Sequence, residues 1–486
     1  MRLSELLREV EFEGSIKNDF DIKFVTDDSR LVRPGALFVC IRHRSFDGHT
    51  AAAEALASGA AAVVTQERLG LENELNVVDS RAAYARLCAA LCGHPERKLR
   101  MIGVTGTNGK TTVTTLIRNI LSDSGIKTLL TGTVCNRLGE ESLPSGLTTP
   151  KPPELYSLLS RAVLSGCEAC VAEASSQALA QGRLEGIAFD AAVFTNITRD
   201  HLDYHGTFEN YLAAKKKLFE HSEVSAVNLD DPRADEIIAA SSGKTVTFST
   251  VLDCADYTAK NISLLPEGVS FELVSKGRIE HINFASPGLF SVSNAMAAAV
   301  CAINLGVDPR SAAQSLARSK GVCGRLERVE CGTPYSVIID YAHTPDGLEQ
   351  VLRALRPSCR GKLIVLFGCG GDRDKTKRPL MGAAACKYAD TVIVTSDNPR
   401  SEEPMRIIGD ILKGTDKKRR GLFIEEDRRR ATALALSLAK PGDTVLLAGK
   451  GHEKYQLICG EKLPLDERET VREILGLPHD TGRKKP

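Results

Sequence analysis

One stretch of this sequence constrains the fold more than any other, a glycine-rich turn between a predicted strand and a predicted helix. It reads MIGVTGTNGKTTVTTLIRNIL over residues 101–121. The apolar start is typical of a buried strand, and the apolar residues after the turn recur at helical spacing. Gly106 and Gly109 allow backbone amides to face a phosphate, Lys110 can reach terminal phosphates, and the Thr111 hydroxyl can hold Mg²⁺. The stretch therefore predicts a phosphate-binding loop in an α/β domain.

The loop departs in one position from the strict phosphate-binding pattern. That pattern has a glycine five residues before Gly109, where this sequence has Val104. A glycine turn without a ligand is the alternative, but the flanking strand and helix are what phosphate binding requires. Because we find no Asn-Lys-x-Asp guanine motif, a GTPase is disfavoured.

The order of strand, polar turn and helix recurs along the chain and predicts an α/β protein. The 486 residues, 42% of them hydrophobic, suffice for about three domains. We predict an N-terminal α/β domain at residues 1–97 and a central domain with a P-loop-type, mostly parallel sheet at 98–324. A C-terminal Rossmann-like α/β domain follows at 325–486. The polar segment CGHPERKLR is interpreted as the first linker.

Composition and charge disfavour several classes of protein. The 63 basic and 62 acidic residues balance, so nucleic acid is not expected as a partner. The longest uncharged run, residues 282–307, carries a proline, a glycine and asparagines and is a poor membrane span. The fourteen cysteines are scattered, and we interpret the one CxxC, Cys167 and Cys170, as buried strand cysteines rather than a metal site. With no signal peptide at the charged N-terminus, we expect a soluble, cytoplasmic protein.

A cluster of acids and histidines follows the apolar run AAVFTNI. Asp200, His201, Asp203 and His205 lie within six residues. At the end of a strand such a cluster suits Mg²⁺ or phosphate chemistry. A solvated polar loop is the alternative interpretation.

The helix after this cluster carries an unexpected lysine. Tyr211, Leu212, Leu218 and Phe219 lie three or four positions from Lys215, which predicts that Lys215 is on the apolar face. Lys216 and Lys217 then point away from it. A lysine that extends to solvent is the usual interpretation. The alternative is a buried lysine with a lowered pKa, whose free amine can react.

Several motifs together resemble those of the Mur ligases, the ATP-dependent amide-forming enzymes of peptidoglycan synthesis. They are GTNGKTT, EASSQALAQGR, DHLDYHG with a following AAK, GRLE and DYAHTP. DSR, GGDRDKTKRP, DNPR and GKGHE resemble the branch that adds the third peptide residue to UDP-N-acetylmuramoyl-L-alanyl-D-glutamate (UDP-MurNAc-L-Ala-D-Glu). The resemblance runs from about residue 25 to residue 470 and implies a three-domain ligase, expected to be a monomer.

The resemblance implies a reaction and a set of residues for it. A substrate carboxylate attacks the γ-phosphate of ATP, an acyl phosphate forms, and an amine displaces phosphate. Lys110, Glu173, His201 and Lys215 are the implied catalytic residues. Two Mg²⁺ sites are implied, one at Thr111 and Glu173, the other at His201 and a carbamate of Lys215. The implied ATP contacts are Gly106, Thr107, Asn108, Gly109, Lys110, Thr111, Thr112, Asn294, Arg325, Asp340 and His343. Ser291 departs from the Asn that the family often has beside the adenine.

The resemblance also implies contacts to the nucleotide-sugar substrate. In the first domain they are Ser29, His43, Arg44 and Ser45, beside the uridine and the diphosphate. In the central domain they are Thr148, Thr149, Ser175, Gln181 and Arg183.

The segment DNPR follows the predicted strand TVIV, at a position where parallel α/β sheets bind ligands. Arg400 suits the distal carboxylate of meso-diaminopimelate through a bidentate pair, and Asp397 with Glu453 suits its ammonium group. Lysine has no distal carboxylate and would leave Arg400 unpaired. The implied diaminopimelate contacts are Arg378, Asp397, Asn398, Pro399, Arg400, Gly449 and Glu453.

Three other interpretations stay open. One is the lysine-adding variant of the same ligase. Another is a folylpolyglutamate synthetase-like ligase, which lacks a uridine-binding domain. The third is a non-catalytic nucleotide switch, which the predicted buried lysine and the acid–histidine cluster disfavour.

Overall fold

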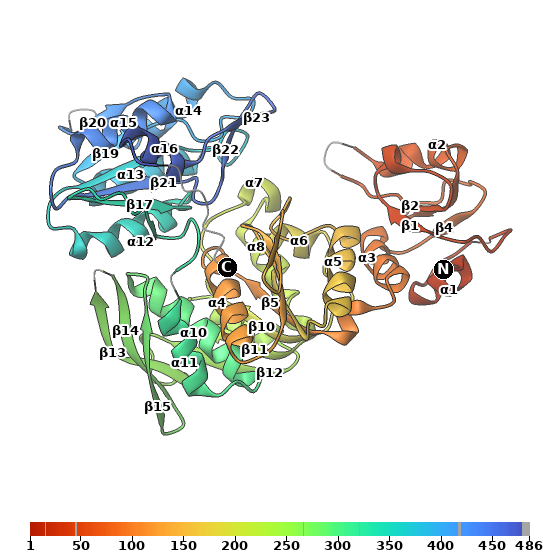
Figure 1. The fold of residues 1–486 in the computed structure, drawn as a ribbon. Coiled ribbons are helices and arrows are strands. Elements are labelled where there is room, and N and C mark those ends of the chain that lie inside the picture. The colour runs from red at the N-terminus through yellow and green to blue at the C-terminus, as the bar shows by residue number, and fades with distance from the viewer. Residues whose placement is uncertain (15, 44–45, 266, 320, 417–418, 479–486) are drawn as a thin grey trace.

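A computed structural model describes residues 1–14, 16–43, 46–265, 267–319, 321–416 and 419–478 of the chain. It contains three large sheets in chain order, each packed with helices, and Figure 1 shows the three bodies from red at the N-terminus to blue at the C-terminus. The predicted mixed α/β fold is confirmed. The predicted domain boundaries stay a prediction.

The N-terminal sheet has four parallel strands in the order β1-β2-β3-β4. Its strands are β1 (Phe24–Thr26), β2 (Ala36–Val39), β3 (Ala60–Thr65) and β4 (Glu74–Asn76), and its helices are α1 (Leu3–Leu6), α2 (Ala52–Ala57) and α3 (Ser80–Leu91). Asp79 caps α3 by accepting from the amides of Arg81 and Ala82. Tyr84 and Leu87 of α3 belong to the same apolar cluster as Leu155 and Leu159 of the central domain. This helix therefore attaches the first sheet to the second.

The central sheet has eleven strands in the order β15-β14-β13-β12-β11-β10-β5-β9-β6-β7-β8. Its strands are β5 (Arg100–Thr105), β6 (Thr128–Thr131), β7 (Asn136–Leu138), β8 (Glu141–Leu143), β9 (Ala169–Glu173), β10 (Phe189–Phe194), β11 (Ser222–Asn228), β12 (Lys244–Ser249), β13 (Tyr257–Leu265), β14 (Gly268–Ser275) and β15 (Arg278–Phe284). The middle strands pair in parallel, as predicted. Both edges are antiparallel.

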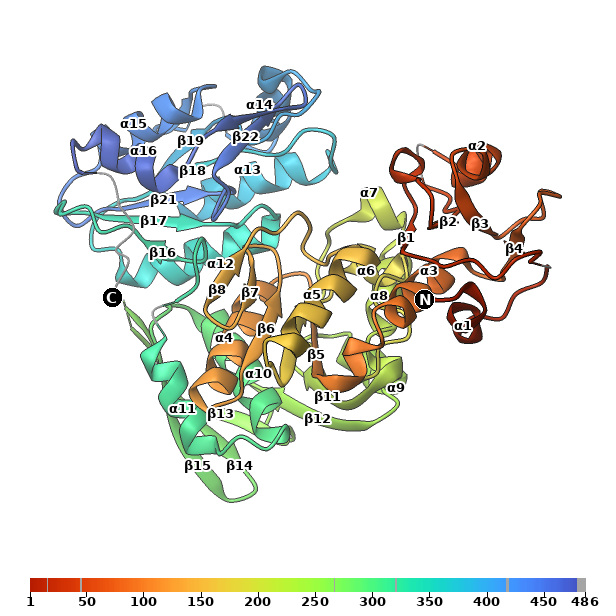
Figure 2. The same ribbon diagram turned by 45° about the vertical axis from the view of Figure 1, so that its right-hand side comes forward.

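Helices cover the two faces of the central sheet. They are α4 (Lys110–Asp123), α5 (Pro152–Leu164), α6 (Ser176–Ala180), α7 (Leu202–His205), α8 (Phe208–Lys216), α9 (Ala234–Ala240), α10 (Leu289–Asn304) and α11 (Pro309–Arg318). Figure 2 shows α4, α10 and α11 beside one another at the central sheet. The small buried side chains of α10, among them Ala295 and Ala298, allow it to lie close to the sheet. No helix of the described chain has the length and apolar character needed to cross a membrane.

The C-terminal sheet has the order β16-β17-β21-β18-β19-β20, with only β16 antiparallel. Its strands are β16 (Glu327–Arg328), β17 (Ser336–Asp340), β18 (Leu363–Phe367), β19 (Thr391–Val394), β20 (Leu422–Ile424) and β21 (Thr444–Ala448), followed by the hairpin β22 (Tyr455–Ile458) and β23 (Glu461–Pro464). Its helices are α12 (Pro345–Leu355), α13 (Lys377–Tyr388), α14 (Pro404–Leu412), α15 (Arg428–Leu438) and α16 (Glu467–Ile474).

The connection from the central to the C-terminal domain is held by Asp340. Its carboxylate accepts from the amides of Leu326 and Ala342, both at 2.7 Å. Leu326 has a φ of +43°, a left-handed conformation that a leucine rarely adopts. A Cβ at Gly324 would lie 2.3 Å from the amide nitrogen of His452. The connection therefore packs directly against the loop after β21.

Candidate active site

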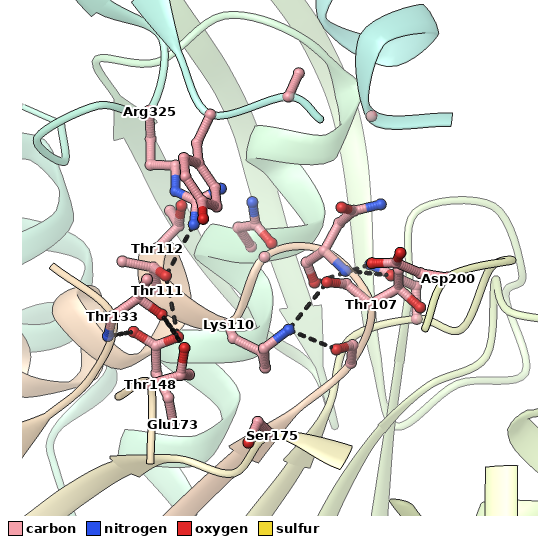
Figure 3. A pocket seen from close by; sticks show the side chains of 18 of the residues that line it. Thr107, Lys110, Thr111, Thr112, Thr133, Thr148, Glu173, Ser175, Asp200 and Arg325 are labelled. Atoms are coloured by element: carbon pink, nitrogen blue, oxygen red, sulfur yellow. Dashed lines mark hydrogen bonds between the residues drawn. The ribbon is translucent and has the colours of Figure 1, made fainter. Parts of the chain in front are cut away.

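The predicted phosphate-binding loop lies between β5 and α4. A Cβ at Gly106 would lie 1.8 Å from Thr195 Oγ1, and one at Gly109 would lie 2.5 Å from Asn294 Oδ1. Glycine is therefore required at both positions. Lys110 Nζ donates to the carbonyl oxygens of Gly106 at 2.8 Å and Thr107 at 3.0 Å. Figure 3 shows this side chain curled along its own loop.

A cavity of about 270 Å³ lies where this loop faces the C-terminal domain. All of the predicted ATP contacts line it, including Asn294 of α10 and, from the C-terminal side, Arg325, Asp340 and His343. The structure thus brings residues from two domains together around one space. Their contacts to ATP stay a prediction.

Beside the loop, a buried carboxylate gathers hydroxyl groups. Glu173, 1% exposed, accepts from the Thr111 hydroxyl at 3.1 Å and from the Thr133 amide and hydroxyl at 2.8 and 2.9 Å. Arg325 Nη2 donates to the same Thr111 hydroxyl at 3.0 Å, and Figure 3 shows these groups converging. Carboxylate and hydroxyl oxygens are donors that Mg²⁺ prefers, so Thr111 and Glu173 fit the predicted metal.

The predicted acid–histidine cluster lies on the other side of the loop. Asp200, 6% exposed, has its Oδ2 at 3.4 Å from Nε2 of His201. Burial raises the pKa of Asp200, but Lys377 and the charges that His201 and His343 carry in acid outweigh it and lower the pKa to about 2. Burial lowers the pKa of His201 below its usual value. At neutral pH the pair therefore presents a carboxylate and a neutral imidazole.

The prediction that Lys215 lies on the apolar face of its helix is confirmed. Lys215 is 1% exposed, and its Nζ lies 4.6 Å from the centroid of the Tyr211 ring. Burial, and then the charge of Lys110, hold the pKa of Lys215 well below its usual value. The neighbours Lys216 and Lys217 are half-buried and exposed. The structure thus supports the interpretation of a buried amine rather than a lysine that extends to solvent.

The predicted nucleotide-sugar contacts are spread over two domains. Thr148, Thr149, Ser175 and Arg183 line the cavity, and Arg183 Nη1 donates to the Thr149 carbonyl at 2.7 Å. Gln181 lies behind them and accepts from Arg183.

In the N-terminal domain Ser29 begins a 3₁₀ turn after β1. His43 Nε2 lies 3.5 Å from Asp27 Oδ2, which also accepts from Lys151 at 3.0 Å. Asp27 and Lys151 were not among the predicted residues, and together they join the first domain to the second. The predicted Arg44 and Ser45 lie outside the described residues.

The predicted amino-acid residues form a separate group at the ends of β19 and β21, and none of them lines the cavity. Asp397 and Asn398, each 6% exposed, lie in the loop that follows β19. Arg400 has a φ of +54° and donates from Nη1 to the Gly371 carbonyl at 2.7 Å. A Cβ at Gly449 would lie 2.8 Å from Asp397 Oδ2, so the two segments meet closely.

Arg378 lies in a buried group of ion pairs. Its side chain is 0% exposed and is paired with Glu402 at 2.7 Å and Asp410 at 3.0 Å. Both terminal nitrogens of its guanidinium group thus donate to carboxylates of α14 and of the loop before it. In this conformation Arg378 stabilises the packing of α13 on α14, and its predicted contact with the amino acid stays a prediction.

Sequence reasoning missed several residues around these sites. Thr133 orients Glu173, and Tyr341 stacks on Arg325, with 4.7 Å between the guanidinium carbon and the ring centroid. Lys450 is fully buried between Asn398 and Glu453. Only Lys450 had a signal in the sequence, because it stands inside the motif GKGHE.

A phosphate-binding loop that faces a second α/β domain across a cavity is typical of multidomain nucleotide-dependent enzymes. The chain belongs to the Mur ligase family, whose members are ATP-dependent amide-forming ligases. The Mur ligase middle domain matches residues 104–302, the Mur ligase glutamate ligase domain matches 324–451, and the Mur ligase family catalytic domain matches 21–90.

The chain is also similar to individual members over nearly its whole length. A UDP-N-acetylmuramoyl-L-alanyl-D-glutamate--2,6-diaminopimelate ligase of Syntrophomonas wolfei is 43% identical, with 98% of this chain and 99% of the relative covered. The ligase of the same name from Caldanaerobacter subterraneus is 44% identical at the same coverage. A solved structure of a ligase of that name superposes with a TM-score of 0.70 at 34% identity, covering 98% of this chain and 99% of the other.

Proposed function

We propose that this protein adds meso-2,6-diaminopimelate to UDP-MurNAc-L-Ala-D-Glu at the expense of ATP, in peptidoglycan synthesis. The observation that carries the proposal is the loop after β19, where Arg400 stands beside Asp397 and Asn398 in a chain of Mur ligase fold. The full-length similarity to ligases named for this activity supports it. A cytoplasmic monomer, acting on soluble substrates, is part of the proposal.

The phosphate-binding loop would hold the triphosphate of ATP. Lys110 donates hydrogen bonds to two carbonyl oxygens of its own loop. With ATP bound it would turn to the β- and γ-phosphates and neutralise the negative charge of the phosphoryl group that is transferred. Arg325 would meet the phosphates from the opposite domain. Since both oxygens of Asp340 accept backbone amides, its main effect would be to hold the segment that carries Arg325.

Thr111 and Glu173 would hold one Mg²⁺, and His201 with a carbamate of Lys215 would hold a second. The ions would supply positive charge between two polyanions, the triphosphate and the substrate carboxylate. The buried amine of Lys215 suits carbamate formation, in which neutral nitrogen adds to CO₂ and releases a proton. The product is an anionic oxygen donor, which a hard cation prefers.

The chemistry would proceed in two steps on the D-glutamate side chain. A carboxylate oxygen attacks the γ-phosphorus, the bond to the bridging oxygen of ADP breaks, and an acyl phosphate forms. The α-amine of the incoming amino acid, once it has lost a proton, attacks the acyl carbon and phosphate leaves. Positioning by the three domains would bring these atoms together.

The far end of the amino acid would lie at the loop after β19. Arg400 would pair with the distal carboxylate and Asp397 with the distal ammonium. Lysine lacks that carboxylate, so it would leave a partly buried guanidinium without an anionic partner.

The proposal is tested by an ATP-dependent ligation assay with UDP-MurNAc-L-Ala-D-Glu and a panel of amino acids. We expect phosphate release and product only with both the nucleotide dipeptide and meso-diaminopimelate. Efficient use of L-lysine would favour the lysine-adding variant. Phosphate release with folate substrates would favour the synthetase-like alternative, and absence of any amino-acid-dependent turnover would contradict the proposal.

A further inference from the structure

The C-terminal domain contains a buried lysine that the proposed chemistry does not use. Lys450 follows β21 and is 0% exposed. A buried ammonium group is costly unless anionic or polar groups surround it. Its partners therefore indicate what it does.

Lys450 holds two of the groups proposed to face the amino acid. Its Nζ donates to Asn398 Oδ1 at 2.9 Å and to Glu453 Oε2 at 2.7 Å. Asn398 Nδ2 donates to the same Glu453 oxygen at 2.9 Å. The three side chains thus form a closed triangle of hydrogen bonds, which fixes the orientation of both the amide and the carboxylate.

Asp397 lies near the same lysine but forms no hydrogen bond with it. Its Oδ1 lies 4.0 Å from Lys450 Nζ, a distance at which charge is felt but no hydrogen bond forms. Over the described part of the chain, no donor to the Asp397 carboxylate is found within hydrogen-bond distance. Asp397 is thus the acceptor that remains available for a ligand's ammonium group.

The charges of this pocket balance only when Lys450 is included. Asp397 and Glu453 are acidic, Lys450 and Arg400 basic. The next buried charges, Arg428 and Glu467, pair with each other at 2.7 Å. A neutral pocket suits a head group with one ammonium and one carboxylate. Without Lys450 the pocket would be net negative and would suit a lone ammonium better.

We propose that Lys450 is a positioning residue that sets amino-acid specificity, by fixing Asn398 and Glu453 and by cancelling one of the two acidic charges. The inference rests on the proposed function, because it concerns the same amino-acid pocket. It adds that selection depends on the charge balance of the pocket as well as on Arg400.

The test compares Lys450→Met, which keeps the length of the side chain and removes the charge, with the wild type. We expect KM for meso-diaminopimelate to rise about tenfold or more, since bonds to charged groups are lost. The KM values for ATP and the nucleotide dipeptide should change less than about twofold. The preference for diaminopimelate over L-lysine, as a ratio of kcat/KM, should fall about tenfold.

Three further variants separate specificity from folding. Lys450→Arg retains the charge and should retain most of the preference. Lys450→Met with Glu453→Gln removes both members of the ion pair, restores the charge balance and should recover part of the preference. Lys454→Met is the matched control, because Lys454 lies in the same loop with its side chain 76% exposed, and it should behave as the wild type.

Some outcomes overturn the inference. One is a folded Lys450→Met enzyme whose preference for diaminopimelate over L-lysine is unchanged. Another is an equal rise of the KM values for all three substrates, because that result indicates a purely structural role. If Lys450→Met does not fold, the double variant decides, and a double variant without any recovered preference counts against the proposal. A wild-type enzyme that prefers L-lysine to meso-diaminopimelate would contradict the proposed function and not this inference. The preference of the wild type is therefore measured before that of any variant.

Discussion

Lys215 in the central domain and Lys450 in the C-terminal domain are equally buried, at 1% and 0% exposure, but their surroundings differ. Lys450 donates to an amide and a carboxylate. Lys215 has the Tyr211 ring as its neighbour, and among the described residues no acceptor lies within hydrogen-bond distance of its Nζ. One lysine is thus held as an ion-pair partner, while the other is a buried amine with a lowered pKa.

The difference shows that burial alone does not define the role of a lysine. Without an acceptor, burial favours the neutral amine, which is the form that reacts with an electrophile such as CO₂. With acceptors on two sides, burial fixes the position of the lysine and of its partners. The central domain therefore offers a reactive group, and the C-terminal domain offers a shaped pocket.

The largest expected effect is that of Lys215→Ala on catalysis. We expect kcat to fall by about 10²–10³-fold, the range found when one group that stabilises transition-state charge is removed. Bicarbonate or a small carboxylate added to the assay should restore part of the activity. Lys216→Ala is the control, since Lys216 is half-buried on a neighbouring face and lies 4.0 Å from Glu236. Wild-type activity of Lys215→Ala would remove Lys215 from the active site.

The effect of Lys450→Met on stability should be of similar size. Removing Lys450 leaves Glu453 without its charged partner, although Asn398 still donates to it, and the loss of one member of a buried ion pair costs about 3–5 kcal/mol. Urea denaturation should therefore show a lower free energy of unfolding, most of which Glu453→Gln recovers in the double variant. If Lys450→Met is as stable as the wild type, the ion pair does not stabilise the fold.

Arg400→Ala should affect one substrate only. A charge-assisted pair is worth about 1.5–3 kcal/mol, or roughly ten- to a hundredfold in kcat/KM for meso-diaminopimelate. The KM values for ATP and the nucleotide dipeptide should stay near those of the wild type. The exposed Arg406 of α14 provides the control, Arg406→Ala. An unaltered preference in Arg400→Ala would show that this loop does not select the amino acid.

The smallest expected effect is a gain in stability from Lys215→Met. Replacing a buried amine without an acceptor should raise the free energy of unfolding by about 1 kcal/mol near neutral pH in carbonate-free buffer. In the unfolded chain Lys215 regains its ordinary pKa of 10.5 and binds more protons than in the fold, so wild-type stability rises as pH increases towards that value. The advantage of Lys215→Met should therefore shrink between pH 7 and 10. Lys217→Met, at an exposed position, should show no such trend.

Local patterns predicted much of the fold and part of the site. The strand, glycine turn and helix around Lys110, the parallel centre of the second sheet and the buried face of Lys215 are all confirmed. Cys167 and Cys170 are both buried, as interpreted, but only Cys170 lies in a strand, because β9 begins at Ala169. The antiparallel edge β13–β15 was not predicted, because an edge exposed on one face has a weaker apolar pattern than a fully buried strand.

The residues that were missed and the ion pairs of Arg378 share a physical cause. Arg378 stands in a motif with other charged residues, but its pairing with Glu402 and Asp410 depends on how α13 packs on α14. Thr133 and Glu173 lie 40 positions apart and meet only because β6 pairs with β9. Spacing in the sequence carries no information about such contacts.

The sequence by itself determined the parallel centre of the second sheet, where the phosphate-binding turn lies and which helix face buries a lysine. These features follow from the periods of strands and helices and from the backbone freedom of glycine, which act over a few residues. Only the tertiary structure decided that Arg325 reaches Thr111 across 214 positions and that Lys450 stands between Asn398 and Glu453. Those contacts depend on strand order and on the packing of whole domains, because side chains far apart in the chain meet only where the sheets bring their ends together.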